Sequence, residues 1–437
     1  MLRDGVRRSQ SPSNAVAPND DSLNVTELND VPSGRNGKVS AHETLYDLHF
    51  IGPLPDKHGK VGGVGLYNLR FIEALATHAS QSARIWVHAQ VTFDPKQAPT
   101  GERITVTPAW RPGPLAFLGF FRILRAKPGI AFFHYEVSLY GSALSSILLS
   151  PIIALFRLKK WKVHILLHHV MLPEFSTQAM REWKTPSPLD GPALFLLKLN
   201  QQVISRVANI AIVHEGSQAQ ALPIGRTIII PHGISVRPSR RNRALQTHVS
   251  NDRPLTIGVF GFIAPYKGVL DVILAVGDLL RRGAPLALNI IGGAHPRMKA
   301  SDDYQQFLTE LNAIAAQYPQ ITLHGYLPAD QLDSAILEND IMLLPYRSTV
   351  GSSGALSYIL GLGMPVAVSD YLASFMDLPF DIPRFKPTRA ALRIFIKGLL
   401  SQARVSYDPR LTSFAEERSW ANVARRYREL INDESTA

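Results

Sequence analysis

Apolar runs with strand-like patterning alternate with helical stretches along most of this chain, in two blocks separated by a polar, basic segment. Alternating strands and helices fold into parallel sheets that carry helices on both faces. The sequence therefore predicts an α/β protein with two Rossmann-like, doubly wound domains. We expect strands at 47–52, 82–87, 104–108, 130–134, 163–168, 209–213 and 228–233, and in the second block at 255–260, 287–291, 321–324, 341–345 and 365–369.

Changes in composition indicate how the 437 residues divide. Residues 1–41 are polar and rich in Ser, Asn, Asp and Pro, so we expect a disordered tail. The Rossmann-like domains are expected at 42–235 and 253–413, joined by a linker at 236–252. The segment 414–437 begins as one amphipathic helix, which we expect to cross back and pack on the N-terminal domain.

The composition restricts both the chemistry of the chain and the partners that it attracts. There is no cysteine, which excludes disulfides, thiolate catalysis and cysteine-based metal sites. The 46 basic and 35 acidic residues give a formal net charge of +11, which favours an anionic substrate, an anionic membrane surface or nucleic acid. No nucleic-acid-binding motif accompanies this charge, so we expect no nucleic-acid partner.

Two turns of small residues, each at the start of a helix, are the strongest indication of a binding site. The first follows an apolar strand and contains Gly261 and Lys267. The second opens a helix shortly after residue 350. Exposed N–H groups and the dipole of a helix N-terminus favour an anion, and a lysine adds a positive charge. The two turns therefore predict a diphosphate site that includes Gly261, Lys267, Ser352, Ser353, Gly354 and Ala355.

Further candidates lie in loops next to the expected strands. Gly62 and Gly63 precede a helix, where they either let a ligand approach the backbone closely or simply form a turn. His168 ends an apolar strand and is either a satisfied edge residue or a ligand contact in the expected cleft. Glu136 follows another apolar strand, where a buried acid needs a partner; it either pairs with a backbone turn or binds an acceptor hydroxyl.

In their order and spacing, these and other short motifs resemble the retaining nucleotide-sugar glycosyltransferases of family 4. Those enzymes have the GT-B architecture, in which two Rossmann-like domains face a central cleft. The resemblance covers roughly residues 46–430. Its motifs lie at 52–55 with 62–64, 134–136, 167–168, 211–214, 230–233, 261–268, 323–326, 344–346 and 352–365, and in a final helix at Trp420.

The resemblance implies a role for each matched residue. It implies that His168, rather than His169, lies near the donor sugar, and it makes His168, Lys267 and Glu136 the expected catalytic residues. It also implies that the cradle and the lysine replace a metal ion, so we expect no metal and no cofactor. The donor contacts that it implies are Gly62, Gly63, Gly261, Phe262, Lys267, Tyr326, Arg347, Val350, Ser352, Ser353, Gly354, Ala355, Leu356 and Tyr358.

Two departures from the family pattern concern the donor site. Phe262 stands where the family commonly has an arginine, and Val350 and Tyr358 stand where it commonly has two glutamates. In the family the first glutamate contacts the donor sugar and the second contacts the ribose. The resemblance therefore implies the diphosphate site more firmly than the sugar and ribose contacts.

These observations lead us to expect a retaining hexosyltransferase that moves a sugar from a nucleotide-diphosphate donor to a lipid-linked or oligosaccharide acceptor in polysaccharide or exopolysaccharide biosynthesis. One alternative is a sugar-nucleotide epimerase, which should have more carboxylates in its cleft and no membrane affinity. A second is a catalytically inactive GT-B-fold binding or scaffold protein, which the missing glutamates favour. A basic nucleic-acid binder is the third, and its affinity should fall steeply with salt.

Apolar segments next to basic clusters suit peripheral binding to an anionic membrane. One lies at 116–121 before Arg122, Arg125 and Lys127, and another lies at 155–156 before a second basic cluster, Arg157, Lys159, Lys160 and Lys162. We expect a cytoplasmic protein that lies peripherally on the inner face of the plasma membrane. The longest uncharged run, 137–156, contains serines, a glycine and a proline, so we expect a buried helix or a helix pair there.

Overall fold

The structure is a computed structural model of the chain. The expected tail at 1–41, most of the expected linker, Gly62 and Val350 lie outside the residues that it describes, so the domain boundaries given above stay predictions. The described residues are 46–57, 63–78, 83–137, 139–141, 143–173, 175, 177, 188–223, 226–237, 253–296, 298–349, 351–376, 378, 382–401 and 409–436.

The first block of the chain forms a seven-stranded parallel sheet. Its strands are β1 (Tyr46–Ile51), β2 (Ala83–Gln90), β3 (Ile104–Trp110), β4 (Ile130–Tyr135), β5 (Lys162–Leu167), β6 (Ile210–Val213) and β7 (Thr227–Ile229). The strand order is β3-β2-β1-β4-β5-β6-β7, so the direction of winding reverses between β1 and β4. In sheets of this kind, ligands bind beyond the carboxyl ends of the strands next to such a reversal.

The second block forms a six-stranded parallel sheet with the same kind of reversal. Its strands are β8 (Leu255–Phe260), β9 (Leu286–Ile291), β10 (Ile321–Gly325), β11 (Ile341–Leu344), β12 (Val366–Ser369) and β13 (Arg384–Phe385). The order is β10-β9-β8-β11-β12-β13. The predicted fold class, two doubly wound α/β sheets, is confirmed. Strand β13 was missed because two residues carry no detectable periodicity.

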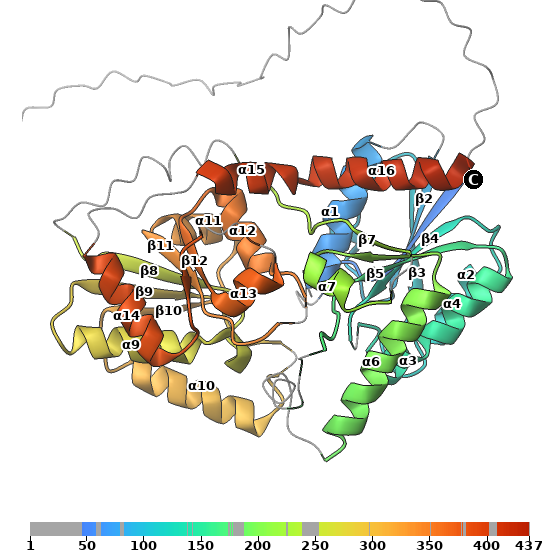
Figure 1. The fold of residues 1–437 in the computed structure, drawn as a ribbon. Helices are drawn as coiled ribbons and strands as arrows, with labels where there is room; N and C mark the ends of the chain where they lie inside the picture. The colour runs from blue at the N-terminus through green and yellow to red at the C-terminus, as the bar shows by residue number, and fades with distance from the viewer. Residues whose placement is uncertain are drawn as a thin grey trace, which may run out of the picture. The chain divides into compact units, whose positions relative to one another are not determined.

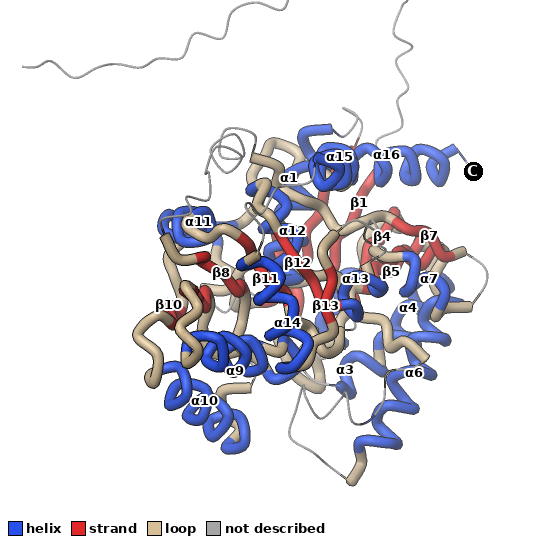
Figure 2. The backbone as a smooth tube through the Cα atoms, turned by 60° about the vertical axis from the view of Figure 1, so that its left-hand side comes forward, coloured by secondary structure: helices blue, strands red, loops and turns tan. Residues whose placement is uncertain are grey.

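Helices cover both sheets (Figures 1 and 2). In the first block they are α1 (Gly63–His78), α2 (Phe117–Ile123), α3 (Ala143–Ile147), α4 (Leu149–Leu158), α6 (Asp190–Val207) and α7 (Gly216–Gln220). In the second block they are α9 (Val269–Leu280), α10 (Asp302–Ala315), α11 (Ala329–Leu337), α12 (Gly354–Leu362), α13 (Asp370–Phe375) and α14 (Arg389–Leu400). Helix α4 packs against α6, and α9 packs against α14.

The uncharged run at 137–156 does not form one long helix. It contains α3 and the greater part of α4, which agrees with the expected helix pair. Among the described residues, no helix combines the length and the apolar character that crossing a membrane requires.

Both faces of the first sheet are buried, as in other doubly wound sheets. Consecutive residues of β4 illustrate this. Phe132 packs with Phe50 and Phe71 in the core on the α1 face, whereas Phe133 packs with Phe156 in the core on the opposite face. Side chains alternate between the faces of a strand, so an apolar run without alternation is the expected signature of such a buried strand.

The C-terminal segment packs back on the first sheet, as expected, but it is two helices and not one. Helix α15 (Pro409–Glu417) ends before α16 (Trp420–Thr436) begins, and α16 lies along α1 (Figure 1). The break has a physical cause: Ile234 N–H donates to the carbonyl of Arg418, and Trp420 N–H donates to the carbonyl of Ile234. These bonds divert the backbone from the helical pattern at Ser419.

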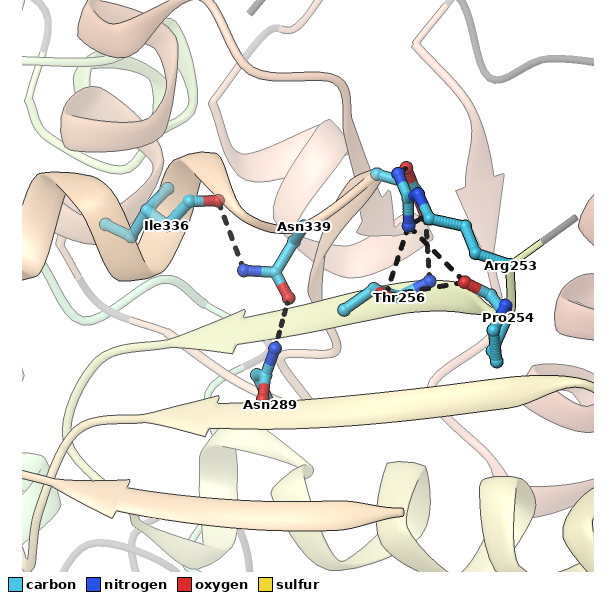
Figure 3. Close-up of polar contacts among 7 residues, drawn as sticks. Arg253, Pro254, Thr256, Asn289, Ile336 and Asn339 are labelled. Carbon is cyan, nitrogen blue, oxygen red and sulfur yellow. Dashed lines mark hydrogen bonds and ion pairs between the residues drawn. The ribbon is translucent and has the colours of Figure 1, made fainter. Parts of the chain in front are cut away.

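Polar contacts fix the start of the second sheet, where the chain leaves the undescribed linker residues (Figure 3). Arg253 pairs with Asp340, whose Oδ2 also accepts from the backbone N–H of Thr256 at 2.8 Å. The amide of Asn339 donates to the carbonyl of Ile336 and accepts from Asn289, which lies in β9. Strands β8, β9 and β11 are thereby tied together next to the linker.

Candidate functional site

The glycine loop after β8 and a lysine side chain meet at one point. Gly261 has a φ of +122°, a conformation that only glycine adopts readily. A Cβ atom on this residue would lie 2.8 Å from the Nζ of Lys267 and 3.6 Å from the Cβ of Ala355. Lys267 ends the short 3-10 helix η2 (Pro265–Lys267), and Ala355 lies in the first turn of α12. Three of the predicted diphosphate residues are therefore neighbours in space.

Lys267 is half-buried and has no acidic partner among the described residues. Its Nζ lies 5.1 Å from the ring centroid of Tyr346. Burial opposes the charged form, but the phenol groups of Tyr346 and Tyr266 favour it more, and the pKa of Lys267 is raised. A partly desolvated ammonium without a carboxylate partner favours an anion nearby.

The N-terminus of α12 adds backbone donors at the same place. Ser353 is the N-cap, and its Oγ accepts from the N–H of Leu356 at 3.2 Å and lies 3.0 Å from the Tyr346 hydroxyl. Gly354 is exposed, and no atom would lie within 4 Å of a Cβ built on it. The first N–H groups of a helix have no partners inside the helix, so those of Gly354 and Ala355 are available to an anion.

The loop before α12 contacts residues of the first sheet. The Oγ of Ser352 donates to Glu215 at 2.8 Å, and the Arg418 guanidinium donates to both oxygens of that buried carboxylate at 3.0 Å. A Cβ on Gly351 would lie 2.5 Å from the carbonyl oxygen of His168 and 2.7 Å from the Cδ2 of His169. The predicted cradle is thus next to the carboxyl ends of β5 and β6.

His168 belongs to a buried chain of histidines that the sequence analysis did not anticipate. Its Nε2 lies 2.9 Å from the Nδ1 of His134, and its Nδ1 lies 3.1 Å from the Nε2 of His214. The chain ends on the carbonyl of Ile230, 3.0 Å from His214. The ring of Tyr67 packs against His134, His168 and His214. Both nitrogens of His168 are therefore occupied within the fold.

Burial keeps these histidines uncharged. It lowers the pKa of His134 and of His214 to about 3, with a neighbouring histidine as the second cause in each case. The pKa of His168 is also lowered well below its ordinary value, first by burial and then by His214. A neutral imidazole both donates and accepts one hydrogen bond, so the three rings are linked without charge, and the buried Nε2 of His134 is left without a partner among the described residues.

His169 and Glu136 lie next to each other beyond the ends of β5 and β4. The distance between the His169 Nε2 and the Glu136 Oε2 is 3.9 Å. Glu136 is buried, whereas His169 is partly exposed and lies against Gly351. At the loop that precedes the cradle, the geometry therefore places the side chain of His169 and the backbone carbonyl of His168.

Neither a model of a known protein family nor a curated protein sequence matches the chain. Solved structures do. Sucrose-phosphate synthase from Thermosynechococcus elongatus matches with a TM-score of 0.62 and 15% identity, over 90% of this chain and 99% of that one. HepE from Anabaena, in complex with UDP and glucose, matches with a TM-score of 0.60 and 14% identity, over 89% and 99%. The trehalose-6-phosphate synthase OtsA matches with a TM-score of 0.61 and 12% identity, over 88% and 99%.

The chain has the GT-B fold. The predicted architecture is confirmed, with the likeness extending over about nine-tenths of this chain. At these identities the likeness establishes the fold and not the activity. The assignment to family 4 and the retaining mechanism stay predictions.

Val350 and Tyr358 stand where the resembled family commonly has glutamates, and the structure describes only Tyr358. Val350 lies outside the described residues. Tyr358 lies in α12, and its hydroxyl donates to Asp333 of α11 at 2.5 Å. The guanidinium of Arg237 pairs with the same carboxylate at 2.6 Å and lies 4.7 Å from the centroid of the Tyr358 ring. Tyr358 is therefore part of a polar cluster of the fold, and its donor contact stays a prediction.

The other predicted donor contacts lie around the same loops. Phe262 packs against Tyr326 and His295, and the Tyr326 hydroxyl donates to the carbonyl of Ala294. Arg347 is exposed, and its N–H donates to the carbonyl of Tyr266. The exposed Gly63 begins α1, with no atom within 4 Å of a Cβ built on it; Leu356 is buried.

In the part of the chain that the structure describes, no group of three or more histidine and acidic side chains could hold a metal ion. The absence of a metal and of a cofactor stays a prediction. A sequence signal for the missed histidines was present: His134 ends one predicted strand and His214 directly follows another. Parallel strands bring such ends together, and this argument had been applied only to His168.

Proposed function

We propose that the chain is a glycosyltransferase, with a nucleoside diphosphate sugar bound by Lys267, the Gly261 loop and the N-terminus of α12. The observation that carries this proposal is the convergence of an ammonium without an acidic partner among the described residues and a helix N-terminus at a glycine. A diphosphate has the charge and the oxygen acceptors that such donors recognise. The GT-B fold supports the proposal by analogy.

The same groups would stabilise charge that develops during transfer. The bond between the anomeric carbon and the diphosphate oxygen breaks, and its electron pair leaves with the nucleoside diphosphate. The Lys267 ammonium and the N–H groups of Gly354 and Ala355 bind that growing charge. The acceptor hydroxyl oxygen forms the new bond, and its proton passes to the departing diphosphate. We propose retention of configuration on the basis of the family resemblance, and proton NMR of the product anomer tests it.

Donor binding is tested by calorimetry or thermal unfolding of the purified protein with UDP, GDP, ADP and their sugar conjugates. UDP is the first ligand to test because HepE was solved with it. A ligand that binds only the folded chain raises the melting temperature. At a concentration a hundredfold above its Kd, it adds about 2.7 kcal/mol to the free energy of unfolding. We expect the shift to disappear in Lys267→Ala.

The matched control is Lys397→Ala, which removes an exposed lysine from α14. It changes the net charge equally and should leave the shift intact. If no nucleotide stabilises the protein, or if the two lysine variants respond alike, the proposed donor site is wrong.

We also propose that the acceptor is lipid-linked, because one side of the first block has an exposed apolar surface. We define this apolar face as the exposed apolar side chains of α2, α4 and α6; Leu158 is 79% exposed and Phe195 is 65% exposed. Helix α4 packs against both α2 and α6, so the three helices are neighbours in the fold. Its residues are Leu118, Phe121, Leu155, Leu158, Phe195, Leu196, Leu199 and Val203.

Basic side chains lie on the same helices or directly after them, at Arg122, Arg125, Arg157, Lys159, Lys160, Lys198 and Arg206. Apolar side chains next to basic ones suit an anionic membrane surface. The test is flotation with phosphatidylglycerol vesicles, in which Leu158→Glu/Phe195→Glu should lose binding. Retained flotation of that variant would contradict a lipid-linked acceptor reached from this face.

A non-catalytic GT-B binding protein is the second candidate. The observation that favours it is Tyr358, whose hydroxyl is bonded to Asp333 at a position where the resemblance leads one to expect a glutamate. Such a protein would bind the nucleotide with Lys267 but would neither transfer nor hydrolyse the sugar. Release of UDP from UDP-sugars, followed with lipid and oligosaccharide acceptors, distinguishes the two.

A further inference from the structure

A cavity lined by none of the proposed donor-site residues lies between the edge of the first sheet and the end of α2. It has a volume of about 430 Å³. Strands β1, β2 and β3 form its floor, and the last turn of α2 with the following residues forms its rim. The lining residues that matter for its chemistry are Asp47, His49, Arg84, His88, Thr107, Arg122 and Lys127.

The floor of this cavity departs from the pattern of the sheet. On the same face, Ile51 and Phe133 belong to an apolar core. At the cavity, Asp47 and His49 of β1 lie beside Arg84 and His88 of β2 instead. Burying polar side chains under a helix costs free energy unless they are bonded. This polar strip is held by an ion pair between Asp47 and Arg84 and by hydrogen bonds that link His49, His88 and Thr107.

The charges of the cavity leave a positive rim. Asp47 accepts from Arg84 at 2.8 and 3.0 Å, and from the indole N–H of Trp86 at 3.1 Å, so it neutralises Arg84 within the floor. Arg122 and Lys127 are exposed at the rim, and neither has an acidic partner among the described residues. Two cations without partners favour an anion at the entrance.

The interior contains a chain of hydrogen bonds that stops at a free nitrogen. The Thr107 hydroxyl lies 3.0 Å from the Nδ1 of His88, and the Nε2 of His88 lies 3.0 Å from the Nδ1 of His49. The buried Nε2 of His49 has no partner among the described residues. Thr107 donates to the carbonyl of Val87, and with that orientation each ring donates toward Thr107, leaving the His49 Nε2 as an acceptor. Burial lowers the pKa of His49 to about 4, so this ring is neutral.

The rim of the cavity adjoins the apolar face defined above. Arg122 follows Phe121, an exposed member of that face, and Leu118 lies one turn earlier on α2. A molecule seated in the cavity would thus have cations at its entrance and apolar side chains beside it.

From these features we propose that the cavity binds the headgroup of an anionic membrane lipid. The phosphate lies at Arg122 and Lys127, the polar end of the headgroup enters the cavity, and the acyl chains lie along α2. The inference rests on the proposed membrane association. It adds one defined binding site for a single lipid to the general attraction between a basic surface and an anionic membrane. The same phosphate chemistry would also suit a free phosphate, and the experiment separates the two sources.

The test uses isothermal titration of the full chain with dihexanoyl phosphatidylglycerol below its critical micelle concentration. A monomeric lipid removes the electrostatic attraction of a whole membrane surface. We expect one site, no binding of dihexanoyl phosphatidylcholine, and at least tenfold weaker binding of inorganic phosphate. Equal affinity for the two lipids overturns the proposal, and equal affinity for inorganic phosphate assigns the cavity to a free anion and also overturns it.

Three variants locate the site. Arg122→Gln/Lys127→Gln removes the rim cations, and Ala126→Trp blocks the entrance without a change in charge; each should weaken binding at least tenfold. The control Arg282→Gln/Lys397→Gln removes two exposed cations that lie in the second block and do not line the cavity, and it should change binding less than twofold. Loss in the control alone, or in none of the three, overturns the proposal. Nucleotide binding is measured in parallel on each protein, so a failure of the donor site is distinguishable from a failure of the lipid site.

Discussion

The Nζ of Lys267 lies 2.8 Å from the point that a Cβ atom on Gly261 would occupy. The ammonium thus uses space that only glycine leaves free. The positive φ of Gly261 directs the chain away from β8 at the same place. The glycine loop and the lysine form one unit, in which the backbone conformation sets the position of the charge.

Gly261→Ala should therefore weaken nucleotide binding as well as destabilise the fold. The new methyl group must displace the ammonium, and a left-handed backbone costs an alanine about 1–2 kcal/mol. We expect the Kd for the bound nucleotide to rise at least about tenfold, equivalent to about 1.4 kcal/mol. Calorimetric titration measures the Kd, and urea unfolding measures the stability.

Gly398→Ala is the matched control for this substitution. Gly398 lies in α14, and no atom would lie within 4 Å of its added Cβ. Alanine in a helix interior should raise stability by up to about 1 kcal/mol and leave nucleotide affinity unchanged. Wild-type affinity in Gly261→Ala would show that the position of the ammonium does not matter for binding.

His168 and His169 should behave in opposite ways when each is replaced by alanine. His168→Ala leaves the ring nitrogens of His134 and His214 without their partner, and it should cost about 2–4 kcal/mol of stability. His169→Ala removes a partly exposed side chain beside Gly351 and should cost less than about 1 kcal/mol. If His169 contacts the bound sugar, its variant loses turnover while it stays folded.

Urea unfolding and sugar-transfer assays on both variants check this difference. A stable His168→Ala protein with reduced turnover would restore the role that the family resemblance implies for His168. A His169→Ala protein with wild-type turnover would remove His169 from the site.

The fold could be predicted from the sequence because the apolar runs that indicate strands are local and recur along the chain. Apolar runs predicted β8 at its observed bounds and most other strands within three residues of their ends. Gly261, Lys267 and Ala355 were predicted to meet because glycine turns and helix starts have a known geometry. What could not be predicted depended on distant segments, such as the break between α15 and α16 that Ile234 causes.

The histidine chain shows the same limit within the site. That a histidine ends a strand is visible in the sequence, but which histidines share hydrogen bonds depends on strand order. His134, His168 and His214 belong to β4, to the end of β5 and to the end of β6, which are neighbours in the sheet. The sequence alone does not show that His134 and His214 occupy the two ring nitrogens of His168, so it predicts a ligand contact for His168.

Breaking the Glu215–Arg418 pair should destabilise the protein strongly. The carboxylate is completely buried and the Arg418 side chain is 14% exposed, and both carboxylate oxygens accept from the guanidinium. Removal of one partner from a buried ion pair leaves an uncompensated charge and typically costs about 3–5 kcal/mol. Arg418→Met should show this loss in urea unfolding at neutral pH.

The exposed pair Arg425–Glu429 in α16 is the control. Arg425→Met should cost less than about 1 kcal/mol, because exposed pairs contribute little. Similar losses in the two variants would mean that the buried pair contributes nothing beyond a surface contact.

Stability should fall as the pH decreases below about 6.5, and His164 offers a clean test. The imidazole is completely buried in β5, and neither ring nitrogen has a partner among the described residues. Burial lowers the pKa of His164 from 6.5 to about 4. The unfolded chain therefore takes up a proton more readily than the folded chain, so the stability present above pH 6.5 is lost as the pH falls toward 4. At pH 5 this histidine should contribute a loss of about 2 kcal/mol.

His164→Phe should remove that contribution, because the phenyl ring does not titrate and can pack against Phe132, whose ring centroid lies 5.0 Å from that of His164. Urea unfolding at pH 7 and pH 5 gives the loss of stability for each protein, and we expect the loss to be smaller in the variant by about 2 kcal/mol. Phe132→Leu is the control, since it disturbs the same packing without a titrating group and should lower stability equally at both pH values. If His164→Phe loses as much stability between pH 7 and pH 5 as the wild type, the neutral buried imidazole is not a source of the acid sensitivity.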